Sequence, residues 1–523
     1  PAAENRGGVL RDEDREALER QQIFLAPHGM EQFHLEIQNL YAALAQPTEK
    51  LTVSYPVSDG KGAEKRPSFV IGRIARLLPS ISVETESADK EYRLSAKSTA
   101  LEYAGEHIGG ALWQYFEGQG DAERALAAMK DASRYTRGHL SRDAVRALYG
   151  GAVTLSASRM DMARSCHFAY FMRYGLKARE RTGAGFDAPQ IGTFVHDVME
   201  HTLRQAKECG GLHTLSKDKL HALVRASIEE YIDRVLPDLC EKSARFRYLF
   251  NRLCATVERI MDEVSEELQS SDFEPLAFEL EFGADGQLPA ITIREENGTA
   301  RVVGKVDRVD GWLHDGKLYL RVVDYKTGKK SFDLAELRYG LGLQMLLYLF
   351  TLKEEGQMLF GGHEIVPAGV LYTPAREPML RCARDTEPET IEKALKKELR
   401  RSGMVLEDPA VLQAMEHSAL ESPCYLPIAV KRDGTVTGSL ASAEQLGKLS
   451  KYVDHILHEI TQEVFAGNID ADPYARTPQQ SACTYCEFAS ACHFENGCGS
   501  DRMEYIKATK NDEFWQYIDE VNG

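Results

Sequence analysis

The amino-acid sequence predicts an α/β fold in which helices flank a central mixed sheet. Three observations predict it. Segments typical of strands alternate with segments typical of helices between residues 276 and 373. Apolar side chains make up 43 % of the 523 residues, which suffices for a sizeable core. No apolar run approaches the roughly 18 residues of a membrane span, so we expect no membrane-inserted segment.

The charge and the cysteine content limit the class of protein. Formal net charge is −17, which disfavours a protein coated in basic surface. It does not exclude binding to nucleic acid, because phosphate contacts need local positive patches. Ten cysteines without a secretory signal predict a reducing, cytoplasmic location, where clustered cysteines suit metal ligation better than disulfides. The chain begins with proline, which indicates processing or a piece of a longer protein.

The front of the chain predicts a smaller α/β region followed by helices. We expect a helix over 35–47 that ends at a proline, a strand over 50–56, and a helix over 69–79. Residues 97–150 read as mostly helical. The organisation that follows from this is a three-part chain, divided into 1–85, 86–150 and 151–523.

The last part contains the elements of the main sheet. Its helices are expected to begin near residue 158 and to cover about 191–208, 216–268, 334–354 and 440–465. Its strands are expected near 276–283, 300–310, 317–326 and 365–373.

Two charged residues end the apolar strand predicted over 317–326. Side chains two positions apart share a face of a strand, so Asp324 and Lys326 lie together while Tyr325 points into the opposite layer. The neighbouring strand offers Asp307. Two carboxylates can hold a hard divalent cation, and a lysine beside them can position water and balance charge on a phosphate. This combination predicts metal-assisted hydrolysis of a phosphodiester.

Two helices add further polar residues at a spacing of four. His196 and Glu200 lie on one face of the first helix, and Gln344 and Tyr348 lie on one face of a helix that is otherwise apolar. Taken alone, His196 is more often a hydrogen-bonded surface or core histidine, and Gln344 and Tyr348 are mostly helix packing. The ordered set G-T-x-x-H-x-x-x-E, G-x-x-D-R-x-D, D-Y-K-T-G and Q-x-x-x-Y is far more specific and favours a nuclease site.

This set resembles the RecB-like branch of the PD-(D/E)xK nuclease superfamily. The resemblance implies that His196, Asp307 and Asp324 are metal ligands, with the carbonyl of Tyr325 as a fourth, and that the metal is Mg²⁺. It implies that Lys326 is the catalytic lysine.

The same resemblance assigns residues outside that core. Gln344 and Tyr348 match a motif whose members contact DNA or support the site. Glu279 matches the acidic residue that precedes the first metal aspartate, and its role stays open.

Three cysteines near the end of the chain, Cys483, Cys486 and Cys492, form a C-x2-C-x5-C pattern. They indicate a metal site that lacks its fourth ligand. On spacing alone, zinc and an iron–sulfur cluster fit equally well. Cys166 is our candidate for the missing ligand, and the other candidates are His167, His493 and Cys498.

A distant cysteine followed by this pattern, around a RecB-like nuclease, resembles the AddB/RexB family. That family forms the B subunit of bacterial two-subunit ATP-dependent helicase–nucleases. The resemblance implies a 4Fe–4S cluster on Cys166, Cys483, Cys486 and Cys492. By analogy with a disulfide, closing so long a loop would stabilise the fold by on the order of 5 kcal/mol.

Residues 39–56 resemble the last motif of superfamily 1 helicases. The motif's arginine, which reaches the ATP γ-phosphate, is replaced by Gln46, and its threonine by Ala45. No G-x-x-x-x-G-K-S/T stretch occurs in the chain. The front therefore resembles the end of a degenerate, inactive helicase-like domain. Family members are about twice as long, so the chain resembles their C-terminal part. The residues that fit the motif are Tyr41, Leu51, Ser54 and Tyr55.

One segment interleaves aromatic and basic residues, as in sites that stack bases and contact phosphates, but a solvated amphipathic helix explains it equally well. Lys329 and Lys330, directly after the catalytic strand, are better placed to meet DNA. The basic residues of the interleaved segment are Arg173, Lys177, Arg179 and Arg181.

The sequence thus predicts an Mg²⁺-dependent single-strand deoxyribonuclease, an exonuclease subunit that takes part in the repair and recombination of DNA breaks. The AddB/RexB resemblance implies a heterodimer with an AddA-type subunit that unwinds DNA, cutting of the 5′-terminated strand, and recognition of a regulatory sequence by the inactive region. Two alternatives stay open. One is a non-catalytic DNA-binding scaffold subunit, and the other is a stand-alone Cas4-like or Dna2-like iron–sulfur nuclease.

Overall fold

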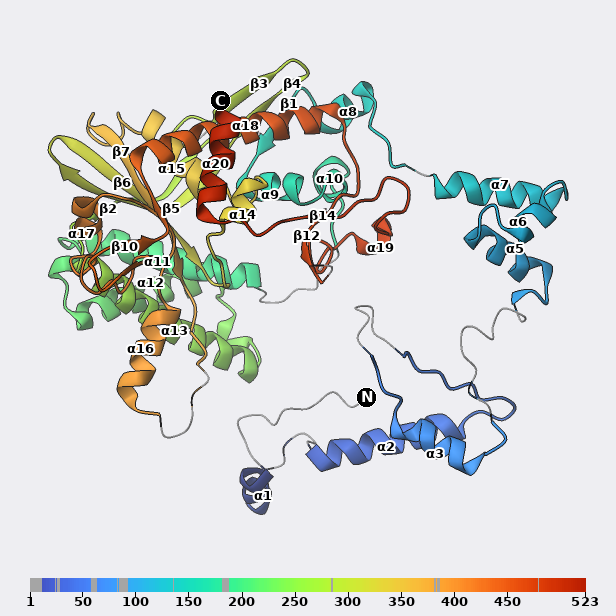
Figure 1. The fold of residues 1–523 in the computed structure, drawn as a ribbon. Helices are drawn as coiled ribbons and strands as arrows, with labels where there is room; N and C mark the ends of the chain where they lie inside the picture. The colour runs from blue at the N-terminus through green and yellow to red at the C-terminus, as the bar shows by residue number, and fades with distance from the viewer. Residues whose placement is uncertain are drawn as a thin grey trace. The chain divides into compact units, whose positions relative to one another are not determined.

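The computed structural model describes residues 12–23, 25, 29–57, 64–81, 83, 93–134, 136–180, 188–283, 286–380, 382, 386–477 and 479–523. The chain divides into two compact units, Pro1–Met129 and Lys130–Gly523 (Figure 1). The boundaries that the sequence placed at 85/86 and 150/151 stay predictions. None of the described helices combines the length and the apolar character that crossing a membrane requires.

Helices are the regular elements among the described residues of the first unit. Its helices α2 and α3 agree with the sequence, whereas the strand expected over 50–56 is wrong, because residues 51–56 adopt no strand. A strand persists only when a neighbouring strand takes up its backbone hydrogen bonds, and an apolar pattern does not supply that neighbour. The helices that begin in this unit are α1 (Asp12–Arg20), α2 (Gly29–Ala45), α3 (Phe69–Leu77), α5 (Lys97–Glu106), α6 (Ala111–Phe116) and α7 (Asp121–Ser133), the last of which extends past Met129.

The second unit is built on a six-stranded sheet with the strand order β11-β8-β7-β6-β5-β2. Strands β6 and β7 pair in parallel, whereas β2–β5, β5–β6 and β7–β8 are antiparallel, so the sheet is mixed, as the sequence predicted. The strands are β2 (Glu274–Phe282), β5 (Gly304–His314), β6 (Lys317–Lys326), β7 (Glu364–Pro374), β8 (Ser402–Leu406) and β11 (Leu440–Ala441).

The turn between β5 and β6 sets the register of the central strands. Asp315 and Gly316 form a two-residue loop with φ values of 49° and 74°. An Asp-Gly loop with both residues at positive φ matches the type I′ hairpin, whose twist suits two paired strands. The resulting register places Arg308 opposite Val323. In the same register, Asp307 lies opposite Asp324, and both side chains point to the sheet face away from Arg308.

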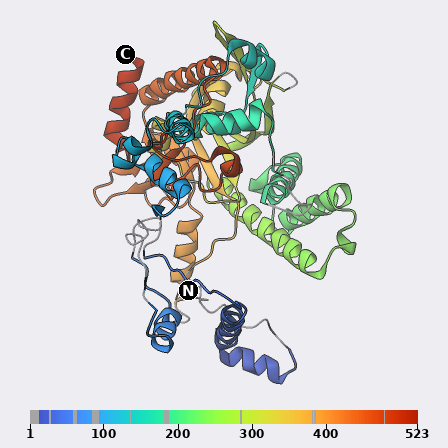
Figure 2. The same cartoon turned by 90° about the vertical axis from the view of Figure 1, so that its right-hand side faces the viewer.

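Helices cover both faces of this sheet. Figure 1 shows α15 and α18 above the strands and α11, α12 and α13 below them. The turned view of Figure 2 shows the three green helices, α11 to α13, together on one side, away from the orange-red α18. Their bounds are α11 (Ala188–Glu208), α12 (Lys217–Val235), α13 (Ala244–Gln269), α15 (Gln344–Glu355) and α18 (Ala443–Ala466).

Two elements expected from the sequence are divided in the structure. The strand expected over 300–310 is two strands in different sheets, since β4 (Gly298–Val302) pairs with β1 (Ala152–Leu155) and β3 (Ile291–Glu295). The helix expected over 334–354 is interrupted between α14 (Leu334–Arg338) and α15. Gly340 and Gly342 adopt φ values of 75° and 68° in this break, a conformation that ends a helix.

Shorter elements complete the second unit. They include α8 (Arg142–Tyr149), α9 (Ala157–Ser165), α10 (His167–Tyr170), α16 (Pro388–Glu398), α17 (Pro409–Met415), β9 (Ile428–Val430), β10 (Val436–Gly438), α19 (Ala489–Cys492) and α20 (Asn511–Asn522). A three-stranded sheet near the end of the chain has the order β13-β12-β14, with β12 (Tyr474–Thr477), β13 (Gln480–Ser481) and β14 (Glu504–Tyr505).

A buried ionic network occupies the sheet face that is turned towards α13. Asp310 forms ion pairs with Arg308 Nε and Arg321 Nε, each at 2.8 Å. Glu267 of α13 forms ion pairs with Arg401 Nη2 at 2.6 Å and Arg321 Nη2 at 3.5 Å. Burying these charges costs less because each of these residues has an ion-pair partner, although both terminal nitrogens of Arg321 lack a hydrogen bond to the described part of the chain. The network fixes β5, β6 and α13 to one another directly behind the candidate site.

Candidate active site

The carboxylate and the ammonium at the end of β6 lie on one face, as the alternation of the strand predicts. The Lys326 Nζ atom is 2.6 Å from the Asp324 Oδ2 atom. Asp324 is almost fully buried. This burial, and to a smaller extent repulsion from the charge of Asp307, raises the pKa of its carboxyl group to about 6. Tyr325 points into the opposite layer, where its hydroxyl accepts a hydrogen bond from Arg308 at 2.7 Å.

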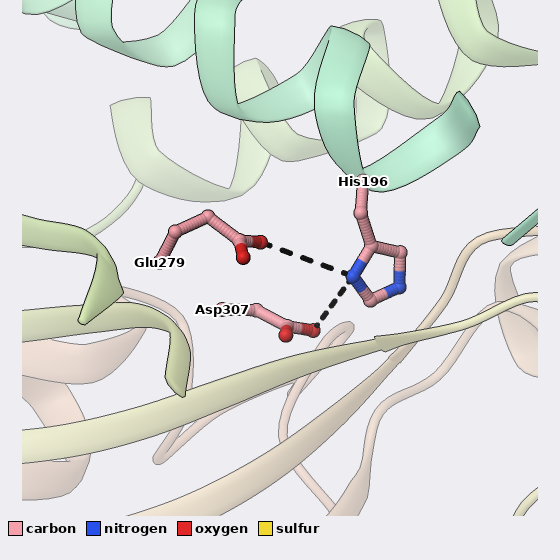
Figure 3. Close-up of side chains that lie close together, drawn as sticks. All are labelled: His196, Glu279 and Asp307. Atoms are coloured by element: carbon pink, nitrogen blue, oxygen red, sulfur yellow. Dashed lines mark ion pairs between the residues drawn. The ribbon is translucent and has the colours of Figure 1, made fainter. Parts of the chain in front are cut away.

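Three potential metal ligands meet beside this pair. One ligand atom each of His196, Glu279 and Asp307 lies within 4.8 Å of the others, which sets this group apart among the described residues. Figure 3 shows the imidazole descending from α11 towards the two carboxylates. The His196 Nδ1 atom is 3.4 Å from Asp307 Oδ2 and 4.0 Å from Glu279 Oε1. Two carboxylates and an imidazole on separate elements fit a divalent cation.

The backbone of β6 holds the other ring nitrogen of His196. The carbonyl oxygen of Tyr325 lies 2.9 Å from the His196 Nε2 atom. The amide of Tyr325 donates to Asp307 Oδ2 at 2.8 Å, which holds that carboxylate against the end of β6. Of the predicted ligands, His196 and Asp307 belong to the central group together with Glu279. Asp324 and the carbonyl of Tyr325 lie next to this group, and their role as ligands stays a prediction.

The electrostatics of His196 reflect this concentration of acid. Burial acts to lower the pKa of the imidazole, but the hydrogen bond and charge of Asp307 outweigh it and raise the pKa to about 9. A positive charge is thus favoured at the position that the carboxylates surround. A divalent cation would supply the same charge and would displace the proton.

Glu279 reaches the site through an unusual backbone conformation. It stands within β2, yet its φ is 49°, in the left-handed region that side chains other than glycine rarely adopt. Strain of this kind persists where the surrounding structure requires it, often at functional sites. Lys305 Nζ lies 2.6 Å from Glu279 Oε2, while burial raises the pKa of Glu279.

Sequence reasoning left the role of Glu279 open and missed Lys305 altogether. Strand alternation could have predicted the position of Lys305, because this residue lies two positions before Asp307 and therefore shares its face of β5. The backbone conformation of Glu279 gave no signal, since nothing in a glutamate within an apolar strand predicts a positive φ.

The two polar residues of α15 adjoin the site. Gln344 Nε2 donates to Tyr348 OH at 3.1 Å and lies 3.5 Å from Asp324 Oδ1. Both residues line a groove of about 600 Å³ that also includes Lys305 and Ser158. Upstream, the amide of Gly342 donates to Asp161 Oδ1 at 2.9 Å, which secures the start of α15. These contacts place Gln344 and Tyr348 between the acidic site and an open groove.

The four cysteines of the predicted cluster line one cavity of about 590 Å³. They are Cys166, Cys483, Cys486 and Cys492. Cys166 follows α9, and the other three come from the loop region around α19.

The thiols and the rival ligands differ in their surroundings. Burial raises the pKa of Cys166 to about 12. His167 is engaged elsewhere, with Asp472 Oδ2 2.5 Å from its Nδ1 atom. Cys498 is exposed and does not line the cavity, whereas His493 does line it. The structure thus brings Cys166 to the other three cysteines.

The basic segment after Cys166 is only partly available to a ligand. Arg173 pairs with Glu487 at 2.8 Å, which attaches this segment to the cysteine-rich loop. Arg181 lies outside the described residues. Lys329 and Lys330, after β6, are exposed.

Comparisons with known proteins agree with this geometry. A profile of the PD-(D/E)XK nuclease superfamily matches residues 154–493. The chain is also similar to proteins described as the B subunit of an ATP-dependent helicase/deoxyribonuclease. It is 30 % identical to that of Ruminiclostridium cellulolyticum over 100 % of this chain, and 31 % identical to that of Acetivibrio thermocellus over 99 %. The identity to that of Thermoanaerobacter pseudethanolicus is 28 % over 100 % of this chain.

The chain spans about half the length of these relatives, covering 47 % of each. Their names confirm the resemblance to the AddB/RexB family that the sequence motifs indicated. The matched residues 154–493 include the site residues and the four cysteines. The chain therefore belongs to the PD-(D/E)XK nuclease superfamily.

Proposed function

We propose that the chain is an Mg²⁺-dependent deoxyribonuclease that hydrolyses single-stranded DNA. The observation that carries this proposal is the meeting of His196, Glu279 and Asp307 within 4.8 Å, beside the Asp324–Lys326 pair. Carboxylate oxygens dominate the group, and Mg²⁺ binds through one or two carboxylates together with water and substrate phosphates. A scaffold without catalysis would have no need to bury these charges side by side.

The residues have distinct tasks in this proposal. Asp307, Glu279, His196 and Asp324 would hold the cation, whose chemistry here is Lewis-acid charge beside the phosphate. Lys326, on the same strand face, orients the attacking water and balances the negative charge that develops on the phosphate. The oxygen of water bonds to phosphorus while the bond to the leaving oxygen breaks, and one proton passes from the water to that leaving group.

We infer further that the four cysteines hold a 4Fe–4S cluster. Support comes from the shared cavity of about 590 Å³ and from the separation of Cys166 from the other three along the chain. Ligands drawn from both ends of the nuclease domain would join those ends and stabilise the fold. The cluster would thus support the site without touching the substrate.

We also propose that this chain acts within a larger assembly. The relatives are named as subunits of a helicase/deoxyribonuclease, which supports a heterodimer with an AddA-type subunit that unwinds DNA. In that assembly the chain would cut the 5′-terminated strand during repair of double-strand breaks. Gln46, in place of the motif's arginine, supports an inactive helicase-like region. We propose that this region recognises a regulatory DNA sequence instead.

The test is cutting of a single-stranded oligonucleotide by the wild type, Asp324→Asn and Asp315→Asn, with Mg²⁺ and with EDTA. Asp315 is the matched control, because it is a carboxylate at the other end of β6 whose side chain is 88 % exposed. We expect cutting by the wild type and Asp315→Asn in Mg²⁺ alone, and loss of cutting in Asp324→Asn. Equal cutting by all three proteins would refute the site, and no cutting by any would favour the scaffold alternative.

A further inference from the structure

A second, smaller pocket opens beside the site, and Lys326 forms part of its wall. Its volume is about 190 Å³. Among the described residues that line it, Glu398 is the one carboxylate. The pocket is therefore rich in cations, although the chain has a net charge of −17. The cations that line the pocket are Lys326, Lys329, Lys330, Arg376, Lys397 and Arg400.

Some of these cations already have partners within the protein. Lys330 Nζ lies 3.7 Å from Glu336 Oε2, and Arg376 Nη2 lies 3.5 Å from Glu398 Oε2. Arg400 donates to the carbonyl oxygen of Pro423. These contacts fix the walls of the pocket.

Two cations remain available to a ligand. Lys329 and Lys397 are exposed, and neither has an ion pair or a hydrogen bond to any residue that the structure describes. Lys329 follows β6 and Lys397 belongs to α16, so the two approach the pocket from different elements. Converging, uncommitted ammonium groups are typical of a site for an anion.

The size of the pocket restricts the anion. Sites for whole small molecules usually enclose about 300–1,000 Å³, which exceeds the 190 Å³ found here. A phosphate group with its water molecules fits, whereas a nucleotide with its base does not. The pocket also adjoins the reacting centre, since Lys326 contacts both Asp324 and this space.

We propose that this pocket binds one phosphate group of the DNA strand that is cut, adjacent to the scissile phosphate. The inference rests on the proposed nuclease function and names a subsite of it. An internal phosphodiester and a 5′-terminal phosphate present the same chemistry to the lysines. The basic pocket would fix the register of the strand, so that the neighbouring phosphate lies against Lys326.

The experiment compares Lys329→Ala/Lys397→Ala with Lys393→Ala/Lys396→Ala in the 523-residue chain. The control removes two lysines from α16 that pair with Glu389 and Glu392 and do not line the pocket. Binding of single-stranded oligonucleotides is measured by fluorescence anisotropy between 50 and 200 mM salt, in Mg²⁺ and in an Asp324→Asn background. Wild-type cutting in Mg²⁺ is measured separately and tests the nuclease function itself.

For Lys329→Ala/Lys397→Ala, we expect a dissociation constant about tenfold higher at low salt. We also expect the slope of its logarithm against log salt to fall by about 1.4, or about 0.7 for each lost contact on a single strand. Inorganic phosphate should compete with DNA on the parent protein and much less on this variant. Affinity, slope and phosphate competition equal to those of the control would overturn the subsite, even where the wild type cuts DNA.

Two further oligonucleotides identify the source of the phosphate. A 5′-phosphorylated strand that binds more tightly than its 5′-hydroxyl counterpart, with the preference lost in Lys329→Ala/Lys397→Ala, would assign the pocket to the terminal group. Equal binding of the two strands, with the reduced slope retained, would assign it to an internal phosphodiester. Either outcome supports the binding of a phosphate group.

Discussion

The Lys326 ammonium lies 2.6 Å from the Asp324 carboxylate, and it also lies 5.8 Å from the centre of the Tyr372 ring. A single lysine is thus held between an acidic partner on its own strand and an aromatic face on the next. Its charge is fixed at the boundary between the metal-ligand group and the basic pocket. Such pre-organisation is what stabilisation of a phosphate during hydrolysis requires.

Replacing Lys326 by methionine, which keeps the apolar stem and removes the charge, should lower kcat by about 10²–10³-fold. Affinity for Mg²⁺ should not weaken, because the ammonium is not a ligand. Lys317→Met is the matched control, since Lys317 begins the same strand and pairs with one carboxylate, Glu364, at 3.0 Å. Steady-state cutting rates and metal titration check both statements. An active Lys326→Met protein would remove this residue from the chemistry.

Replacing Glu279 by glutamine should weaken metal binding by about tenfold, because one of the converging carboxylates loses its charge. Glu281→Gln is the control, because Glu281 also neighbours Lys305, at 3.6 Å, but stands outside the ligand group. Calorimetric titration with Mn²⁺ in place of Mg²⁺ measures the metal affinity of both variants. If both variants bind the metal equally weakly, the metal affinity depends on negative charge near Lys305 and not on the position of Glu279.

Replacing Cys483 by serine should remove the iron and lower the melting temperature of the nuclease domain. The physical reason is the loss of a cross-link between distant segments, which for a disulfide over so long a loop is worth on the order of 5 kcal/mol. Cys498→Ser is the control, because Cys498 is exposed and lies outside the cavity. The visible spectrum of anaerobically purified protein, with iron, sulfide and zinc counted, gives the readout. A colourless wild type that contains one zinc would refute the cluster.

The buried network behind the site predicts a dependence of stability on pH. Burial acts to raise the pKa of Glu267, but the charges of Arg401 and Arg321 hold it at about 2. In the unfolded chain it returns to about 4.3. Because the pKa of Glu267 is lower in the folded protein than in the unfolded chain, its ionised form stabilises the fold above pH 4.3. This contribution to the free energy of unfolding, on the order of 3 kcal/mol, is lost as the pH falls towards 2.

Urea unfolding at a series of pH values between 6 and 3 checks this prediction. The midpoint of the wild type should fall more steeply with acid than that of Glu267→Gln, which has no carboxyl group to protonate. Glu266→Gln, an exposed neighbour on α13, should retain the wild-type dependence. Parallel curves for all three proteins would show that other groups govern the acid sensitivity.

Much of the site could be predicted from local pattern. The two-residue alternation of a strand puts Asp324 and Lys326 on one face, whatever the rest of the chain does. The four-residue spacing of a helix does the same for Gln344 and Tyr348. The neighbouring strand offered Asp307, and the structure adds the Asp315–Gly316 turn, which sets the register of β5 and β6 and brings Asp307 opposite Asp324. These relationships depend on residues close together in the sequence, and the structure agrees with each.

Local pattern failed where the outcome depended on a distant neighbour. The strand expected over 50–56 does not form, because β-structure requires hydrogen bonds from another segment. The residues expected as one strand over 300–310 divide between two sheets, because the partners of each half are different strands. Periodicity describes a segment by itself, and pairing is a property of two segments.

By itself, then, the sequence determined the chemical groups, their spacing and the face of each element on which they lie. Only the tertiary structure decided that Glu279 enters the ligand group through a φ of 49°, and that Lys329 and Lys397 meet at one pocket. The reason is physical. Backbone periodicity acts over a few residues, whereas the positions of groups far apart in the chain are set by the packing of whole elements against a common core.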